Sequence, residues 1–256
     1  MILDEICAAR RLDVARAREA RPLAAPARRV DAYRMHAALS APGVGLITEI
    51  KKASPSKGPI DPGLDVAERA REYAAAGARA ISVLTEPEWF AGSLADLERA
   101  HGAVPATPLL RKDFIVDEYQ VLETAHSGAA ALLLIVAALE ESTFRRLFSL
   151  ADGLGLDVLV EVHTEAELDV ALASPARLIG VNNRNLQTLK IDLSISEALI
   201  PRIPRDRLAV AESGFSRPEE VRRLADCGAR AFLVGESLMT HGQPGAKMRE
   251  LLSGLT

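Results

Sequence analysis

The sequence predicts a (β/α)8 barrel, an α/β fold, preceded by an N-terminal helical extension. Eight short apolar runs alternate with amphipathic stretches of helical length, and 256 residues suffice for eight such units. The passage from helix to strand also repeats, because Ala76–Ala80, Ser127–Ala131 and Cys227–Ala231 each place glycine second and lead into an apolar run. We therefore expect a reused βα unit and a single domain over residues 1–256, of which residues 1–41, with a proline-bearing break at Arg21–Pro26, form the extension.

Each predicted strand is short and mostly unbroken, as expected for strands buried on both faces of a parallel sheet. In chain order these strands are Leu46–Ile50, Ala80–Leu84, Pro108–Leu110, Ala131–Ile135, Val158–Val160, Leu178–Val181, Leu208–Ala211 and Ala231–Val234. The clearest predicted helices between them are Asp65–Ala76, Asp117–His126, Glu140–Ala151, Thr164–Ala173 and Arg217–Cys227. Glycine marks the predicted helix ends at Gly77, Gly128, Gly153 and Gly228.

Eight βα units either close into a barrel or form an open doubly wound sheet. No glycine-rich dinucleotide motif and no P-loop follows the first strand. The dinucleotide-binding form of the open sheet thus lacks its main support, and the barrel is preferred.

Composition and charge exclude several classes of protein. Apolar residues make up 48% and aromatic residues 4%, so the core is expected to be aliphatic. With 31 basic and 35 acidic residues spread along the chain, the net charge of −4 favours binding of neither nucleic acid nor an acidic membrane. The N-terminus resembles no signal or transit peptide, and no apolar run reaches membrane-spanning length. These features predict a soluble, cytoplasmic protein.

The cysteines and histidines predict no metal site. Cys7 and Cys227 lack a CxxC partner and are expected to be reduced thiols. His163 follows Glu161 by two residues and is expected near the rim of the barrel. The other histidines lack the spacing of metal ligands and are interpreted as surface or capping residues: His36, His101, His126 and His241.

Polar and charged residues follow almost every predicted strand. (β/α)8 enzymes carry their active sites at this end, and charges beside apolar strands are costly to bury unless they are paired or used. A ring of structural ion pairs is the alternative to an active site. No Ser/His/Asp or Cys/His arrangement is present, which leaves acid–base chemistry by lysine and glutamate. The residues in question are Glu49, Lys51, Lys52, Thr85, Glu86, Arg111, Lys112, Asp113, Glu161, Asn182, Asn183, Arg184, Glu212, Ser213, Gly235, Glu236 and Ser237.

The loops after the last two strands predict a phosphate site. They carry Ser213-Gly214 and Gly235-Glu236, whose glycines allow the backbone to approach an anion. Lys51 and Ser54 from the first loop lie next to the eighth strand in a closed barrel and add charge and a hydroxyl group. Since a small hydroxyl residue would suit phosphate better than Glu236, we expect only its backbone N–H to contribute and its carboxylate to point away. The substrate is therefore expected to be a phosphorylated small molecule.

Six motifs at the strand ends carry a family resemblance: Glu49–Gly58, Ser82–Glu86, Leu110–Phe114, Val160–His163, Gly180–Leu186 and Ala211–Gly214. In this order they resemble the motifs of indole-3-glycerol-phosphate synthases, and the resemblance extends over nearly the whole chain. It implies ring closure with decarboxylation and dehydration of 1-(o-carboxyphenylamino)-1-deoxyribulose 5-phosphate to indole-3-glycerol phosphate, in tryptophan biosynthesis. It also implies that neither a cofactor nor a metal takes part.

The resemblance assigns catalytic roles to named residues. Lys112 is expected to protonate the ribulose carbonyl, with its pKa lowered by an apolar barrel mouth. Glu161 is expected to work with Lys112 and to act as the base during loss of water. Glu49 and Lys51 form a second acid–base pair, and Asn182 orients the sugar hydroxyl or carbonyl. Which lysine protonates in which step is left open.

The resemblance also assigns residues that bind the substrate. Arg184 is expected to meet the anthranilate carboxylate, while Glu212, as a further catalytic residue, and Ser213 complete the polar ring. Phe90 and Phe114 form apolar walls against the aromatic ring. The resemblance further implies a lid from the extension around Asp31–Leu39, where Tyr33, Met35 and His36 stand instead of the family's phenylalanine, so that the lid is expected to pack differently.

Two alternatives are weighed against this interpretation. Another phosphosugar barrel, such as a phosphoribosylanthranilate isomerase, needs a Cys/Asp pair at strand ends, where neither Cys7 nor Cys227 lies. A catalytically silent barrel that serves as a binding module would be free to lose Lys112 and Glu161, which are present. Oligomeric state and docking to other enzymes of the tryptophan pathway stay open.

Overall fold

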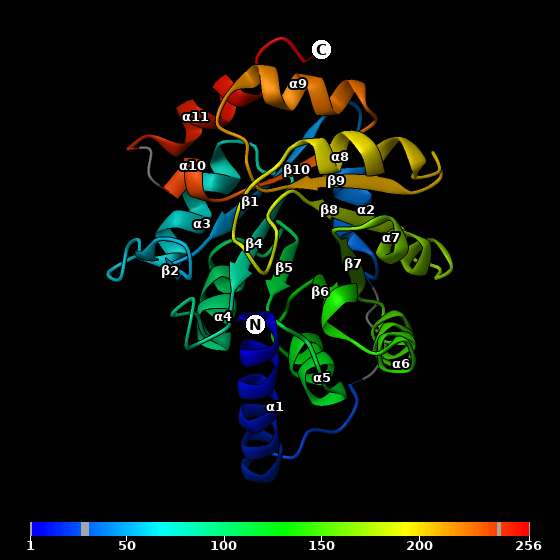
Figure 1. The fold of residues 1–256 in the computed structure, drawn as a ribbon. Helices are drawn as coiled ribbons and strands as arrows, with labels where there is room; N and C mark the ends of the chain where they lie inside the picture. The colour runs from blue at the N-terminus through cyan, green and yellow to red at the C-terminus, as the bar shows by residue number, and fades with distance from the viewer. Residues whose placement is uncertain (1, 27–30, 240–241, 256) are drawn as a thin grey trace.

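Eight parallel strands close into a barrel in the computed structural model, which describes residues 2–26, 31–239 and 242–255 (Figure 1). Each strand pairs with its neighbour in the chain, and the last pairs with the first. The predicted (β/α)8 barrel is thus confirmed. Its strands are β1 (Gly45–Ile50), β4 (Ala80–Leu84), β5 (Leu109–Lys112), β6 (Ala131–Ile135), β7 (Asp157–Val162), β8 (Leu178–Asn182), β9 (Leu208–Glu212) and β10 (Ala231–Val234).

Four strands end later than their apolar runs predicted: β5 at Lys112, β7 at Val162, β8 at Asn182 and β9 at Glu212. Lys112 still pairs with Leu84 of β4, and Glu161 pairs with Ile135 of β6, so both charged residues lie within strands. The backbone ladder continues because these side chains have partners at the mouth of the barrel, as described below. Hydrophobicity alone therefore placed these strand ends too early.

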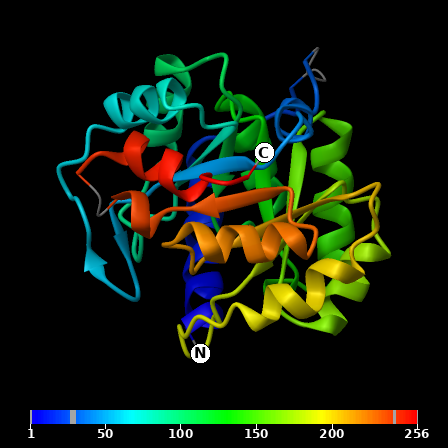
Figure 2. The same ribbon diagram turned by 90° about the horizontal axis from the view of Figure 1, so that it is seen from above.

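Helices surround the barrel in both views (Figures 1 and 2). They are α3 (Val66–Ala75), α4 (Leu94–Ala103), α5 (Glu118–His126), α6 (Glu141–Gly153), α7 (Glu165–Leu172), α8 (Ser194–Leu199), α9 (Pro218–Asp226), the short α10 (Glu236–Met239) and α11 (Pro244–Leu251), with the 3-10 turns Val136–Ala138 and Ile200–Arg202. A small hairpin of β2 (Ala53–Ser54) and β3 (Gly58–Pro59) lies in the loop after β1. After α6 the left-handed residue is Gly155, at φ 77°, and not the predicted Gly153, which belongs to the helix.

The core is largely aliphatic, as the composition predicted, and the structure divides it into two layers. One layer fills the barrel and includes Ile47, Leu110, Leu133 and Val210. The other packs the outer faces of the strands against the helices. This arrangement buries both faces of every strand and leaves polar side chains for the strand ends.

The extension is helical, but it does not cover the barrel as predicted. In α2 (Arg34–Leu39), Met35 and Leu39 are fully buried in the inner layer, and the backbone N–H of His36 donates to Asp157 at the start of β7 (3.0 Å). This segment therefore plugs the amino-terminal end of the barrel, because its two apolar side chains complete the core there. The expected lid at residues 31–39 was wrong.

The first helix, α1 (Ile2–Ala20), approaches the opposite end of the barrel. It packs beside α5 (Figure 1). Ile2, Leu3 and Ile6 line a small cavity at the mouth, together with Phe90 and Phe114. The part of the extension that adjoins the candidate site is thus the first turns of α1.

Candidate active site

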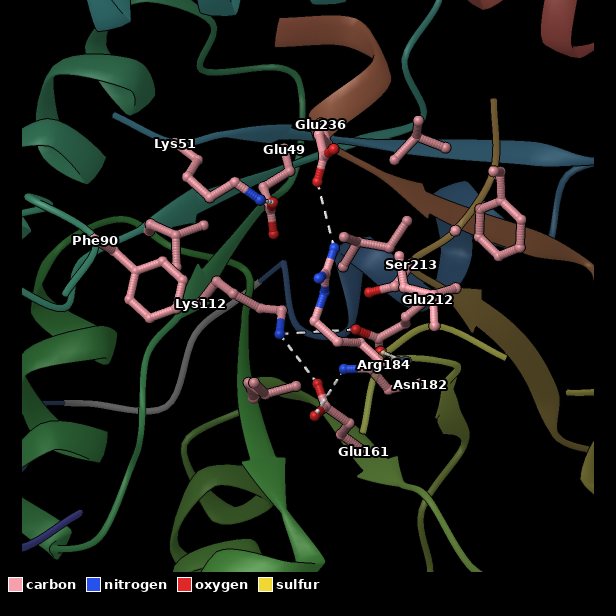
Figure 3. A pocket seen from close by; sticks show the side chains of 18 of the residues that line it. Glu49, Lys51, Phe90, Lys112, Glu161, Asn182, Arg184, Glu212, Ser213 and Glu236 are labelled. Carbon is pink, nitrogen blue, oxygen red and sulfur yellow. Dashed lines mark hydrogen bonds and ion pairs between the residues drawn. The ribbon is translucent and has the colours of Figure 1, made fainter. Parts of the chain in front are cut away.

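The carboxyl ends of the strands enclose a cavity of about 440 Å³ (Figure 3). This volume is suited to a small molecule. Ser54 lies apart, in a smaller adjoining cavity that shares Lys51, Phe90, Phe114 and Arg184 with the larger one. The other residues that were given a catalytic or binding role line the main cavity: Glu49, Lys51, Phe90, Lys112, Phe114, Glu161, Asn182, Arg184, Glu212, Ser213, Gly214, Gly235 and Glu236. Five of the polar strand-end residues line neither cavity: Lys52, Thr85, Glu86, Arg111 and Asn183.

Lys112, Glu161 and Glu212 form the centre of the cavity (Figure 3). Lys112 Nζ lies 3.0 Å from Glu161 Oε2 and 3.7 Å from Glu212 Oε2. The lysine side chain is 15% exposed, whereas each glutamate side chain is 1% exposed. One cation and two carboxyl groups therefore share a site that is nearly closed to water, where electrostatic interactions are strong.

The pKa of Lys112 is raised, not lowered as predicted. Burial by itself lowers this pKa, but the attraction of Glu161, Glu212 and Glu49 outweighs it. The prediction considered only the apolar mouth and omitted the carboxylates that converge on the amine. This environment consequently favours the ammonium form of Lys112, which can donate a proton.

The pKa values of the two central glutamates are shifted in opposite directions. Burial raises the pKa of Glu161, but Lys112 and then His163 reverse this effect and lower the pKa to about 2. The pKa of Glu212 is raised well above its ordinary value by burial and by the negative charge of Glu161. Two carboxyl groups this close to each other do not both ionise readily. The opposite directions of the two shifts favour Glu161 as the carboxylate and Glu212 as the carboxylic acid.

Asn182 and the pair Glu49–Lys51 complete the polar ring. Asn182 donates from Nδ2 to Glu161 (3.2 Å) and accepts at Oδ1 from the backbone N–H of Arg184 (3.0 Å). It therefore holds Glu161 and the loop after β8. Lys51 donates to Glu49 across 2.5 Å, so that the predicted acid–base pair is in contact.

The loops after β9 and β10 meet at one side of the cavity. Ser213 and Gly214 have φ angles of 65° and 95°, which turns the backbone sharply after β9. Asn183 supports this turn because its Nδ2 donates to the carbonyls of Glu212 (3.0 Å) and Ser213 (3.1 Å). A Cβ at Gly235 would collide with the carboxylate of Glu49. Position 235 therefore requires glycine, because the carboxylate of Glu49 occupies the space of a side chain.

The carboxylate of Glu236 points into the cavity and not away from it, contrary to prediction (Figure 3). Its Oε2 lies 3.3 Å from Arg184 Nη2, and its Oε1 lies 3.2 Å from Lys57 Nζ. The two cations, from the loops after β8 and β1, attract the carboxylate inward. Their attraction could not be read from the sequence because neither is its neighbour in the chain.

An apolar wall faces the polar side. The rings of Phe90 and Phe114 lie 6.2 Å apart between their centroids. Leu133 and Ile135 of β6 also line the cavity, and sequence reasoning missed them because it considered polar strand ends only. Their alternate positions on a predicted strand are the signal that could have identified them.

Other predictions concern groups outside the cavity. Cys7 in α1 and Cys227 after α9 are free thiols, and neither belongs to a strand. Among the described residues, no group of three or more His, Cys, Asp or Glu side chains could hold a metal ion, and no helix is long and apolar enough to cross a membrane. His241 lies outside the described residues.

Comparison with known proteins agrees with this geometry. The family model described as "Indole-3-glycerol phosphate synthase" matches residues 3–251. Proteins with this name from Nocardioides sp. and Dehalococcoides mccartyi are 49% identical (98% of this chain, 97% of the relative) and 52% identical (82% of each). The solved 3-hexulose-6-phosphate synthase from Salmonella typhimurium shares the fold at a TM-score of 0.63 and 12% identity, covering 81% of this chain and 96% of that one. The chain belongs to the indole-3-glycerol phosphate synthase family.

Proposed function

We propose how the residues of the cavity divide the steps of the family's reaction. The chain is a carboxy-lyase that converts 1-(o-carboxyphenylamino)-1-deoxyribulose 5-phosphate into indole-3-glycerol phosphate, a step of tryptophan biosynthesis. The observation that carries the assignment of roles is the contact of Lys112 with both Glu161 and Glu212, two buried glutamates whose pKa values are shifted in opposite directions. A proton donor and a proton acceptor are thereby present in one cavity.

Ring closure requires an acid at the carbonyl oxygen. As the aromatic carbon attacks the ribulose carbonyl, the Lys112 ammonium group donates a proton to the developing alkoxide. Loss of carbon dioxide then returns the bonding electrons to the ring. Phe90, Phe114 and Leu133 hold the ring on the apolar side, which leaves the carboxylate free to depart.

Dehydration requires one acid and one base. The Glu212 carboxylic acid donates a proton to the departing hydroxyl group, and the Glu161 carboxylate accepts the proton lost from the neighbouring carbon. Glu161 returns this proton to the Lys112 amine, 3.0 Å away. Asn182 keeps Glu161 aligned for both transfers. Over the whole reaction the substrate takes up two protons, from Lys112 and Glu212, and loses one to Glu161. Because that one returns to Lys112, Glu212 regains its proton from solvent.

The phosphate group binds in our proposal between the loops at Ser213-Gly214 and Gly235-Glu236. Backbone N–H groups and the nearby Lys51 supply hydrogen bonds and charge. Arg184 extends toward the same side, and it meets the anthranilate carboxylate only if it leaves Glu236. We infer further that the whole chain acts as one domain in the cytoplasm, with no nucleic acid or membrane partner.

A direct assay tests these roles. Lys112→Ala is expected to abolish turnover, which is followed by indole fluorescence after addition of the anilino-ribulose phosphate, and to leave substrate binding nearly unchanged. The matched control is Lys247→Ala, because Lys247 pairs with Glu250 on α11, away from the cavity. Near-normal turnover of Lys112→Ala would remove Lys112 from its role as the acid. Turnover that a chelator stops and zinc or magnesium restores would overturn the metal-free mechanism.

A further inference from the structure

His163 lies behind the catalytic carboxylate and takes no part in the mechanism above. It directly follows β7, two residues beyond Glu161, and its side chain is 10% exposed. Nε2 lies 3.4 Å from Glu161 Oε1 and, within the described part of the chain, has no well-aligned hydrogen bond. A buried ring nitrogen is therefore directed at the carboxylate that is to accept a proton, at the oxygen that does not face Lys112.

The other side of the ring is fixed by Glu167 of α7. The Glu167 Oε2 atom lies 3.3 Å from His163 Nδ1 and accepts the His163 backbone N–H across 2.8 Å. Thr164 Oγ1 donates to the second oxygen of Glu167 (3.1 Å) and in turn caps α7. Because a carboxylate only accepts hydrogen bonds, Nδ1 carries a proton and Nε2 faces Glu161.

Three ionisable groups face the imidazole. Glu161 on β7 and Glu167 on α7 are both anionic, whereas Lys112 on β5 is cationic and stands on the far side of Glu161. Burial lowers the pKa of His163, but Glu167 and Glu161 outweigh burial and Lys112, so that the pKa is raised. This environment favours the imidazolium form.

The mechanism creates a need for a second cation. Once Lys112 has given its proton to the substrate, its positive charge beside Glu161 is gone. Glu161 is 1% exposed and lies near Glu212, and both features disfavour its ionised form. Without the charge of Lys112, the hydrogen bond from Asn182 alone would keep Glu161 ionised. A carboxylate that takes up a proton at this moment could not act as the base in the dehydration step.

We propose that His163, held as an imidazolium by Glu167, is a positioning residue that keeps Glu161 ionised while Lys112 is neutral. The inference rests on the proposed roles of Lys112 and Glu161. Nε2–H is directed at Glu161 Oε1, and the proton stays on the imidazole throughout. His163 does not line the cavity, and it acts on the reaction through Glu161.

The pH dependence of turnover tests this role. The imidazolium is present below the pKa of His163 and is lost as the pH rises through it, so that kcat of the parent falls on the alkaline side. His163→Gln is expected to lower kcat about ten-fold, the effect of one lost hydrogen bond to a charged group, and to remove this alkaline decline. KM should change little, because His163 lies behind the cavity wall.

Glu167→Gln provides a second variant with a distinct expectation. Its amide oxygen still accepts the backbone N–H of His163, but the negative charge is gone. The alkaline decline is therefore expected at lower pH, together with a lower pKa of the His163 ring measured by nitrogen NMR. His126→Gln is the control, since His126 is exposed at the end of α5, where its Nε2 lies 3.1 Å from the carbonyl oxygen of Ala24.

The outcomes separate the inference from the proposed function. No turnover by the parent would overturn the proposed function itself. An active parent whose kcat and pH profile are unchanged by His163→Gln would overturn the role of His163. A His163 ring that NMR finds neutral from pH 5 to 8 in the parent protein would overturn this role as well.

Discussion

Glu236 places a negative charge where the phosphate is proposed to bind. Its side chain is 38% exposed and lies between Arg184 and Lys57. A dianionic phosphate that enters this side of the cavity competes with the Glu236 carboxylate for Arg184. The carboxylate also repels the phosphate, since both are negative. Substrate binding should therefore displace Glu236 from the arginine.

Replacement of Glu236 by glutamine tests this competition. Glu236→Gln removes the charge at nearly constant volume, and we expect phosphate to inhibit about three- to five-fold more strongly, which corresponds to roughly 1 kcal/mol for a partly exposed ion pair. The measurement is the inhibition constant of inorganic phosphate, with Glu141→Gln on the exposed face of α6 as control. Unchanged inhibition would contradict the competition, and weaker inhibition would show that Glu236 assists binding by holding Arg184.

At the scale of elements, the loop after β10 owes its conformation to Glu49 of β1. Gly235 is not among the residues with positive φ, so that a side chain there is excluded by space and not by backbone conformation. A Cβ would displace the Glu49 carboxylate and, through it, Lys51. Glycine after β10 is thus required to keep the Glu49 side chain of the neighbouring strand β1 in place.

A matched pair of alanine variants tests this requirement. Gly235→Ala is expected to weaken phosphate inhibition and to reduce turnover, because the Glu49–Lys51 pair must move. The two effects multiplied together are expected to amount to about ten-fold. Gly63→Ala is the control, since a Cβ at Gly63 meets no atom within 4 Å. Circular dichroism verifies that both variants fold. Equal inhibition constants for Gly235→Ala and the parent would place the phosphate elsewhere.

The elements also indicate what the sequence can predict. The apolar runs located all eight strands because both faces of each are buried, and the order of polar strand ends located the cavity. Contacts between distant residues were out of reach: Lys112 and Glu161 extend β5 and β7, and Glu236 turns inward toward Lys57 and Arg184. The rise in the pKa of Lys112 has the same origin, since its carboxylate partners come from other strands.

At the scale of the molecule, one buried ion pair joins the extension to the barrel. Arg10 of α1 donates to both oxygens of Asp113, through Nε (3.1 Å) and Nη2 (3.0 Å). Asp113 has a fully buried side chain, follows Lys112 directly, and also accepts from Arg111 (3.0 Å) and Thr85 (2.7 Å). The end of β5 that carries Lys112 is therefore held by residues from three parts of the chain.

Loss of Arg10 should accordingly affect stability and site together. Arg10→Met keeps much of the volume but leaves Asp113 buried with fewer partners, and we expect a loss of about 3 kcal/mol in the free energy of unfolding, at the lower end for a broken buried pair because Arg111 and Thr85 remain. Arg145→Met is the control: Arg145 and Glu141 are exposed on α6, so that its loss should cost less than about 1 kcal/mol. Urea denaturation measures both values. Equal losses in the two variants would mean that α1 is not anchored through Asp113, whereas a larger loss for Arg10→Met with reduced turnover of the folded fraction would link the anchor to the position of Lys112.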